Sequence, residues 1–402
     1  MKLTIPAVVA LVLAFQAKAD SPYPNAVTVE SPLGVIVVSV EATDCVLTEV
    51  SAIDPAKAQF RTYKTRFPWG LVSFTPVGDC GTPTRVKIKL PAAIPANGTF
   101  HSFGYTNADF YGEPRWLVLP TTISGDVASF ELRDDRDGEF NSNAQDSGAD
   151  SNSGIHVLLG GIGVPINYAD MYWGGPSQNG WGMSLVQHGE RMFGVLFGYD
   201  TFGRPTWYSM PNMVFSTQQD SLASSAYSPR SAPYFAYGAS SLVVGDALGT
   251  FSFSFDSKGA LFMNLPIGPV TTLKRQPFGP PSTAVVPQVG DMWWGGPSQN
   301  GWGIAIMQQG ASLFSVWYTY DVDGTPTWFV MPTGTWTSPD TYEGRVFVTS
   351  GSRTWAEGIY DADTLGVIDV GSFKMQFAGN YALMTYDVQR HFGTLELTRQ
   401  PF

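Results

Sequence analysis

The sequence predicts an all-β protein in which a disulfide-bearing β-sandwich precedes two duplicated antiparallel β units of meander or barrel type. Three observations predict this class. The chain has 43 glycines and 29 prolines among 402 residues, more than the ~12% of ordinary proteins, so turns are frequent. Its 12 tryptophans and 26 phenylalanines supply apolar cores and exclude general disorder. Apolar residues alternate with a period of two along many segments, and we find no convincing helical period.

The charge balance excludes one class of partner. The chain carries 34 acidic residues against 23 basic ones, and its formal net charge is −11. A protein that binds a nucleic acid needs basic patches against the phosphate backbone. We therefore expect no nucleic-acid partner.

Residues 1–19 have the pattern of a secretory signal peptide. Lys2 gives a basic start, residues 7–15 are an apolar run, and Ala17-Lys18-Ala19 is a cleavage site of the A-x-A type. We therefore expect a secreted, periplasmic or cell-surface protein. No later segment reaches the ~20 apolar residues of a membrane helix, so the chain is not expected to span a membrane after signal cleavage.

The first folded domain is expected over residues 20–165. Short strand-like segments separated by Pro, Gly and Asp clusters predict a β-sandwich. These segments are residues 35–40, 71–75, 85–90, 116–119, 128–132 and 155–159. Cys45 and Cys80 are the only cysteines, and because export places them in an oxidising compartment, we predict that they form a disulfide. Two buried thiols are the alternative.

An acidic segment near the end of this domain suggests a metal. Asp134, Asp135, Asp137 and Asn141 place several oxygen ligands on one short loop. Calcium takes six or more oxygen ligands, so we predict a calcium site formed by these four residues. The spacing does not fit an EF-hand loop, and a plain solvated acidic loop is the alternative.

An internal duplication dominates the second half. Residues 170–182 recur as residues 291–303 with twelve of thirteen positions identical, and Arg-Gln-Pro-Phe closes each copy, at residues 275–278 and 399–402. The duplication predicts one Trp-rich unit over residues 166–279 and a second over 291–402. Residues 280–290 between them contain Pro280, Pro281 and Pro287, which indicates a linker.

Within each unit the alternation predicts strands. Residues 181–187 and 191–199 are expected to form a hairpin whose turn is Gly189-Glu190, since glycine suits the first position of a type II′ turn. The aromatic row of Phe193, Val195, Phe197 and Tyr199 is repeated in the second unit, so we expect it to face the core.

The repeated loop supplies the candidate ligand-binding residues. Tryptophan rings beside amide side chains match a sugar, which offers C–H groups for stacking and hydroxyls for hydrogen bonds. The alternative is architectural, because a tight loop also fixes the register of its strands. The ten candidates are Trp173, Ser177, Gln178, Asn179 and Trp181 in the first unit, and Trp294, Ser298, Gln299, Asn300 and Trp302 in the second.

Signatures of catalysis are missing from the sequence. The four histidines, at positions 101, 156, 188 and 391, have no metal-type spacing, and no nucleophile elbow or phosphate-binding loop occurs. We therefore expect a non-catalytic recognition protein at or outside the cell surface, with an extracellular glycan as the favoured ligand and calcium as the one cofactor to consider. A hydrolase acting on an extracellular polymer and a structural or adhesive surface protein are the alternatives.

Two resemblances accompany this prediction. Residues 85–165, through residues 86–91, the strand at Trp116 and residues 123–126, resemble the choice-of-anchor β domain of bacterial exported proteins. That family has a run of Asp-Gly and Asn-Gly pairs, of which Asp137-Gly138 is kept here. Residues 170–402, through the two Trp-Gly-Gly-Pro-Ser-Gln-Asn-Gly-Trp-Gly strings, resemble a tandem module of exported Gram-negative proteins. This second resemblance implies an exported location and a tandem architecture only.

Overall fold

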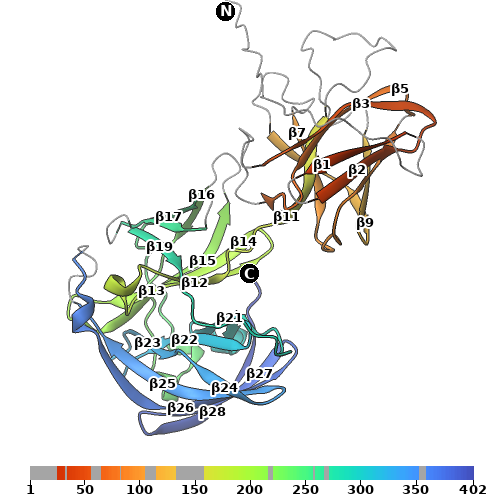
Figure 1. Cartoon of the computed structure of the whole chain (residues 1–402). Helices are drawn as coiled ribbons and strands as arrows, with labels where there is room; N and C mark the ends of the chain where they lie inside the picture. The colour runs from red at the N-terminus through yellow and green to blue at the C-terminus, as the bar shows by residue number, and fades with distance from the viewer. Residues whose placement is uncertain are drawn as a thin grey trace, which may run out of the picture. The chain divides into compact units, whose positions relative to one another are not determined.

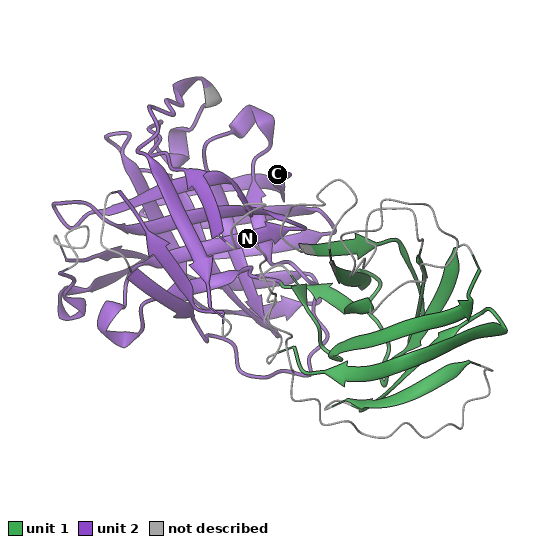
Figure 2. Ribbon diagram, turned by 90° about the horizontal axis from the view of Figure 1, so that it is seen from above, with its two compact units in different colours: residues 1–166 green, residues 167–402 purple. Residues whose placement is uncertain are grey.

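A computed structural model of the chain has two compact units, residues 1–166 and 167–402 (Figures 1 and 2). The structure describes residues 25–31, 34–55, 65–81, 83–104, 115–132, 158–215, 221–256, 259–266, 271–352 and 359–402. Within these ranges the regular structure is β-strands with a few short 3-10 turns. The predicted all-β class is confirmed.

Unit 1 is the predicted β-sandwich, made of two antiparallel sheets. The first sheet has the order β1 (Ala26–Ser31), β2 (Gly34–Val40), β6 (Thr84–Lys89), β10 (Val127–Leu132) and β9 (Thr121–Ser124). The second has the order β3 (Asp44–Ile53), β5 (Leu71–Asp79), β11 (Leu158–Pro165), β7 (Thr99–Gly104) and β8 (Arg115–Leu119), with β4 (Thr65–Arg66) beside β11. Alternate side chains of both sheets fill the space between them.

The core of the sandwich joins the two sheets. Phe100 of β7 stacks on Phe130 of β10 with 3.9 Å between ring centroids, and both rings are buried. Cys45 of β3 is bonded to Cys80, the residue after β5, so the predicted disulfide is confirmed. The predicted calcium ligands, Asp134, Asp135, Asp137 and Asn141, lie outside the described residues, and this site stays a prediction.

The first repeat closes into an eight-stranded antiparallel barrel. Its strands are β12 (Asp170–Trp173), β13 (Gly182–His188), β14 (Arg191–Tyr199), β15 (Pro205–Phe215), β16 (Ser221–Ser225), β17 (Thr250–Phe255), β18 (Leu261–Asn264) and β19 (Thr271–Arg275). Closure pairs β12 with β19, which leaves neither strand as a free edge.

The second repeat closes in the same way. Its strands are β20 (Asp291–Trp294), β21 (Gly303–Gln309), β22 (Ser312–Tyr320), β23 (Pro326–Met331), β24 (Gly334–Ser338), β25 (Thr341–Ser350), β26 (Gly366–Ala378), β27 (Tyr381–Val388) and β28 (His391–Arg399). Pairing of β20 with β28 and of β23 with β25 completes an eight-stranded ring, in which β24 follows β23 along the same edge of β25. Two barrels therefore follow the sandwich.

The predicted hairpins are present in both barrels. His188 pairs with Arg191 and Gln309 with Ser312, so each loop has two residues. Gly189 has a φ of 61° at the first loop position, a backbone conformation that favours glycine. This confirms the strand pairing that was predicted from the alternation.

The aromatic row of β14 is buried, but not in the place we predicted. Met192, Gly194 and Leu196 face the interior of the first barrel, where Gly194 lies against methionines of β13 and β15. Phe197 faces outward and packs against Tyr318 of the second barrel, with 6.2 Å between the two ring centroids. The row is thus repeated because it lies in the contact between the barrels, and β14 is buried on both faces.

The predicted linker runs along the second barrel without forming a strand or helix within residues 279–290. The side chain of Gln309 accepts hydrogen bonds from the backbone N–H groups of Phe278 (3.0 Å) and Gly279 (3.2 Å). Gln308 accepts in the same way from Val289 (2.7 Å) and Gly290 (3.2 Å). Two adjacent glutamines of β21 therefore fix both ends of the linker.

Candidate functional site

The repeated loop joins the first two strands of each barrel through a 3-10 turn. In the first barrel this turn is η2 (Pro176–Gln178), and in the second it is η5 (Pro297–Gln299). Proline at the first position has a preset φ that suits the turn. Gly175 and Gly296 precede the turns with φ values of 90° and 79°, which other residues rarely adopt. The Gly-Gly-Pro part of the motif is thus required by the backbone.

The glutamine and the second tryptophan of each loop bind each other. Trp181 Nε1 donates to Gln178 Oε1 at 3.1 Å, and Trp302 Nε1 donates to Gln299 Oε1 at 3.4 Å. Both indoles are buried, with 5% and 7% of their surface exposed. These bonds hold the loop together, so much of the pattern that we interpreted as a sugar-binding face is used internally.

Each loop also binds the opposite barrel. The backbone carbonyl of Asn179 accepts a hydrogen bond from Tyr360 Oη at 2.7 Å, although Tyr360 lies in the loop before β26. The next carbonyl, Gly180, accepts from Tyr199 Oη at 2.7 Å. Burial raises the pKa of Tyr360 to about 12, so its hydroxyl stays protonated and can donate at neutral pH.

The second loop makes the equivalent contacts, here with a tyrosine of the first barrel. Asn300 O accepts from Tyr237 Oη, which belongs to the first barrel, and Gly301 O accepts from Tyr320 Oη. Tyr237 also stacks on Tyr320, with an angle of 17° between the two ring planes. The architectural interpretation therefore explains the near identity of the two loops.

One cavity nevertheless adjoins the second loop. This inter-barrel pocket has a volume of about 390 Å³, within the ~300–1,000 Å³ typical of ligand sites. Aromatic rings from both barrels line it: Phe193, Trp207, Tyr227, Trp294, Trp302 and Tyr318. Further lining comes from Pro211, Pro229, Leu242, Val244, Met292 and Val195, and from the polar residues Ser209, Asn300 and Gln400. Of the described residues that line the pocket, none carries a charge.

The rings of the pocket offer their apolar surfaces. Trp207 Nε1 donates to Thr319 O at 2.9 Å, and Tyr318 Oη lies 2.8 Å from the hydroxyl of Ser184. Trp294 Nε1 is buried and has no hydrogen-bond partner among the described residues, so it is not presented to the pocket. Burial also raises the pKa of Tyr318, so this hydroxyl is uncharged.

Two side-chain amides supply polar groups. Asn300 and Gln400 both line the pocket, and their side chains make no hydrogen bond within the described part of the chain. An amide offers both a donor and an acceptor. The pocket thus combines apolar ring surfaces with two free amides.

Only some of the predicted ligand-binding residues line the pocket. Trp294, Asn300 and Trp302 come together at the pocket. Hydrogen bonds within the loops use the side chains of Gln178, Gln299 and Trp181. Three further side chains are exposed: Ser177, Asn179 and Ser298. Trp173 is half-buried at the end of β12. The first-repeat residues and the second-repeat Ser298 and Gln299 are not among the described residues that line the pocket.

Several lining residues were not predicted from the sequence. Trp207 and Gln400 belong to strings that both repeats contain, Pro-Thr-Trp and Arg-Gln-Pro-Phe, but repetition alone does not indicate contact with a ligand. Tyr227, Leu242 and Val244 come from the segment between β16 and β17. The string Tyr-x-Ala-x-x-Leu at residues 237–242 of this segment recurs at residues 360–365, a signal that lies outside the repeated strings considered above. Nothing in the sequence linked that segment to the loop of the other barrel.

The repeated acids have structural partners. Asp170 pairs with Arg275 at 3.0 Å and Asp291 with Arg399 at 2.8 Å, so each pair ties the first strand of a barrel to its last. Asp200 accepts from the backbone N–H of Phe202 at 2.8 Å and caps its turn. Within the described ranges no group of three or more His, Cys, Asp or Glu residues is arranged to hold a metal.

No family model matches the chain, and neither a curated protein nor a solved structure matches it. Among the described residues there is no helix with the length and apolar character needed to cross a membrane.

Proposed function

We propose that this is an exported, non-catalytic recognition protein that binds a glycan in the inter-barrel pocket. The observation that carries the proposal is the meeting of the free Asn300 and Gln400 amides with the Trp294 and Trp302 rings. Export is supported by the signal-like residues 1–19, which would deliver the protein to the periplasm, the cell surface or the medium.

The chemistry of the pocket suits an uncharged sugar. A pyranose ring presents C–H groups on one face, which pack on indole and phenol rings, and hydroxyls at its edge, which bond to amides. Because the described lining is uncharged, a charged sugar would lose its hydration without gaining an ion pair. We therefore infer that the pocket takes a neutral sugar residue, such as one at the end of a chain.

The alternatives have less support. A glycosidase-type hydrolase requires two carboxyl groups that converge on one bond, whereas the described lining residues include neither Asp nor Glu, and Asp170 and Asp291 are held by arginines. A purely adhesive protein gains nothing from an aromatic pocket with free amides. Recognition accounts for both features.

The duplication provides a matched control for the test. Asn300→Ala removes an amide of the pocket, whereas Asn179→Ala removes the equivalent amide of the first loop, and both leave the backbone carbonyl contacts in place. Val244→Trp, at a half-exposed position, adds an indole to the pocket wall.

The measurement is a glycan array followed by calorimetric titration of the best neutral glycan. We expect Asn300→Ala to weaken binding by about 5–10-fold, the value of one hydrogen bond, and Asn179→Ala to leave it unchanged. Val244→Trp should abolish binding while the melting temperature is kept. The proposal would be refuted if the wild type bound no glycan on the array. It would also be refuted if the folded Val244→Trp variant bound the glycan as tightly as the wild type.

A further inference from the structure

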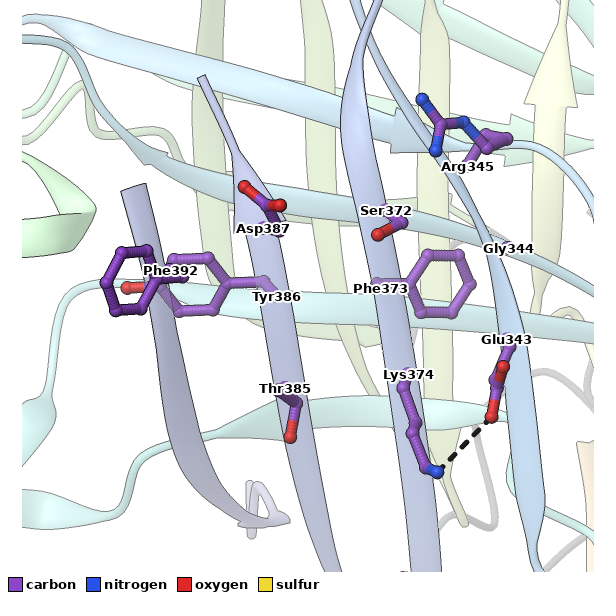
Figure 3. Close-up of a pocket in the computed structure, with 10 residues that line it drawn as sticks. All are labelled: Glu343, Gly344, Arg345, Ser372, Phe373, Lys374, Thr385, Tyr386, Asp387 and Phe392. Atoms are coloured by element: carbon purple, nitrogen blue, oxygen red, sulfur yellow. Dashed lines mark ion pairs between the residues drawn. The ribbon is translucent and has the colours of Figure 1, made fainter. Parts of the chain in front are cut away.

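The outer face of the second barrel carries a separate hollow, which we call the outer groove. It lies on β25, β26, β27 and β28 and has a volume of about 480 Å³ (Figure 3). Its floor is the row formed by Gly344, Phe373 and Tyr386, which are register partners across three strands. Phe373 and Tyr386 turn their rings into the barrel and are buried, so along this row the outer face is backbone only.

Two rows of outward side chains form the walls of the groove. Arg345, Ser372 and Asp387 make one wall, and each is the register partner of the next. Glu343, Lys374 and Thr385 make the other wall in the same way. Figure 3 shows these two rows on either side of the floor. Phe392 of β28 is the register partner of Asp387 and continues the first row.

The charges of the walls do not all cancel. Lys374 Nζ lies 3.3 Å from Glu343 Oε1, and Arg345 forms a bidentate pair with Asp369 at 2.5 and 2.8 Å. These contacts neutralise both cations locally. Asp387 has neither a hydrogen bond nor an ion pair within the described residues, although its charge acts on Arg345 at longer range. The carboxylate of Asp387 is therefore the uncompensated charge of the groove.

An exposed aromatic ring lies directly beside this carboxylate. Phe392 is the register partner of Asp387, and 84% of its surface is exposed. Cross-strand partners have Cβ atoms ~5 Å apart. A cation that contacts the face of Phe392 can therefore also reach Asp387, and the combination of an aromatic face with a carboxylate is suited to an ammonium group.

We propose that the outer groove binds an amino sugar of a glycan chain. The ammonium group pairs with Asp387, the sugar ring packs on Phe392, and the hydroxyls of the sugar bond to Ser372 and Thr385 on the walls. This site is distinct from the inter-barrel pocket, and it takes a cationic sugar where the pocket takes a neutral one. It does not depend on the pocket being occupied.

The closed barrel favours a sugar over a peptide at this place. A peptide backbone usually binds a sheet by adding a strand to a free edge. Each strand below the groove is already paired on both sides, including β28, which pairs with β27 and β20. An extended peptide would thus find no backbone partners in the groove, whereas a sugar needs only the side chains.

The test compares two oligosaccharides that differ in one group. A hexamer of β-1,4-linked glucosamine carries free amines, and the N-acetylglucosamine hexamer carries none. Titrations in mildly acidic buffer keep the amines protonated. We use the Val244→Trp chain, whose inter-barrel pocket is filled, so that the neutral hexamer cannot bind there. We expect this chain to bind the glucosamine hexamer at least about tenfold more tightly than the N-acetylglucosamine hexamer. Both Asp387→Asn and Phe392→Ala should remove that preference.

Three controls make the result decisive. Asp363→Asn removes an exposed carboxylate outside the groove and should leave binding within about twofold, which excludes a general effect of net charge. Asn300→Ala should not change glucosamine binding, so failure of the pocket and failure of the groove are separable. A Val244→Trp chain that does not bind the glucosamine hexamer, or that binds both hexamers equally, would overturn the proposal. A lysine hexapeptide that binds more tightly than the sugar in an Asp387-dependent way would overturn it too.

Discussion

His188 Nε2 lies 2.9 Å from Asp291 Oδ1, and this contact joins β13 of the first barrel to β20 of the second. The reciprocal contact also exists, because Gln309, which occupies the position of His188 in the second repeat, donates to Asp170 Oδ1 at 3.2 Å. Equivalent residues thus bind each other in both directions. The two barrels are related in the way that subunits of a symmetric dimer are related.

The same reciprocity holds in the centre of the contact. Trp207 of the first barrel donates to the carbonyl of Thr319, and Trp328 of the second donates to the carbonyl of Gly198 at 3.1 Å. A change in the motif of either repeat therefore alters a surface that the other repeat contacts. This mutual restraint explains why the motif strings stay nearly identical while other parts of the repeats differ.

The first prediction concerns the buried carboxylate of this contact. Asp291 has 7% of its side chain exposed and is bound by both Arg399 and His188. Asp291→Asn leaves the guanidinium without its counter-charge, and we expect a loss of about 2–4 kcal/mol in the free energy of unfolding. Asp170→Asn is the matched control, since Arg275 is 40% exposed and water screens that pair. Urea titration measures both, and an equal loss in both variants would contradict the explanation.

The second prediction tests the docking of the loops. Gly180 has a φ of 113°, and a Cβ there would lie 2.6 Å from Leu365 Cδ1 and 2.7 Å from Tyr360 Oη. We expect Gly180→Ala to destabilise unit 2 by about 1–3 kcal/mol. Gly189→Ala is the control, because Gly189 also has positive φ but no atom of the described residues lies within 4 Å of the added carbon.

Tryptophan fluorescence separates unit 2 from unit 1 in that measurement. Only Trp69 and Trp116 of the twelve tryptophans belong to residues 1–166, so the signal reports mainly on the barrels. Equal destabilisation by Gly180→Ala and Gly189→Ala would show that backbone strain alone, without contact between the barrels, accounts for the effect.

Local patterns in the sequence predicted local structure well. The alternation in residues 191–199 corresponds to β14, and residues 35–40, 71–75 and 128–132 lie within β2, β5 and β10. Of these strands, β2, β5 and β10 have one clear apolar face, which the period of two reveals. In contrast, β3 was missed because the alternation that begins with its buried residues Cys45 and Leu47 is interrupted at Glu49, and no buried residue follows in the strand.

Contacts between the repeats could not be predicted from the same patterns. The alternation in β14 shows two apolar rows, but nothing in it distinguishes the inside of one barrel from the surface of the next. Likewise, Asn300 and Gln400 are far apart in the chain, and only the closure of the second barrel brings both to one pocket. The outer groove was not predicted, because Asp387 and Phe392 look like ordinary exposed residues of a strand.

The third prediction is the contribution of the disulfide. Cys45 and Cys80 are separated by 35 residues, and closing such a loop restricts the unfolded chain by about 3–4 kcal/mol. Replacing both cysteines with alanine should lower the stability of unit 1 by that amount and leave the fluorescence transition of unit 2 unchanged. Differential scanning calorimetry resolves the two transitions. A stability of unit 1 that is the same with and without the bond would contradict the prediction.

The fourth prediction concerns calcium at Asp134, Asp135, Asp137 and Asn141. A cation that binds only the folded chain stabilises it by about 2.7 kcal/mol at a hundredfold excess over its dissociation constant. Calcium should therefore raise the melting temperature of unit 1, and EDTA should reverse the shift. Asp135→Asn combined with Asp137→Asn should remove the response. Identical melting curves in calcium and in EDTA would leave the solvated acidic loop as the explanation.

The last prediction is a pH dependence that arises in unit 1. His101 lies in β7 with 8% of its surface exposed, its Nε2 is 2.8 Å from Thr99 Oγ1, and burial lowers its pKa to about 4. In the unfolded chain a histidine titrates near pH 6.5. Between that pH and about 4, the unfolded chain therefore binds a proton at His101 and the folded chain does not. The stability contributed by neutral His101 is complete above about pH 6.5 and is lost as the pH falls towards 4, by about 3 kcal/mol in total. Carboxylates titrate in the same range, so the decisive quantity is the difference between the wild type and His101→Gln. We expect the stability of unit 1 to fall less steeply in His101→Gln between pH 6.5 and 4, and parallel pH profiles of the two proteins would show that His101 does not contribute.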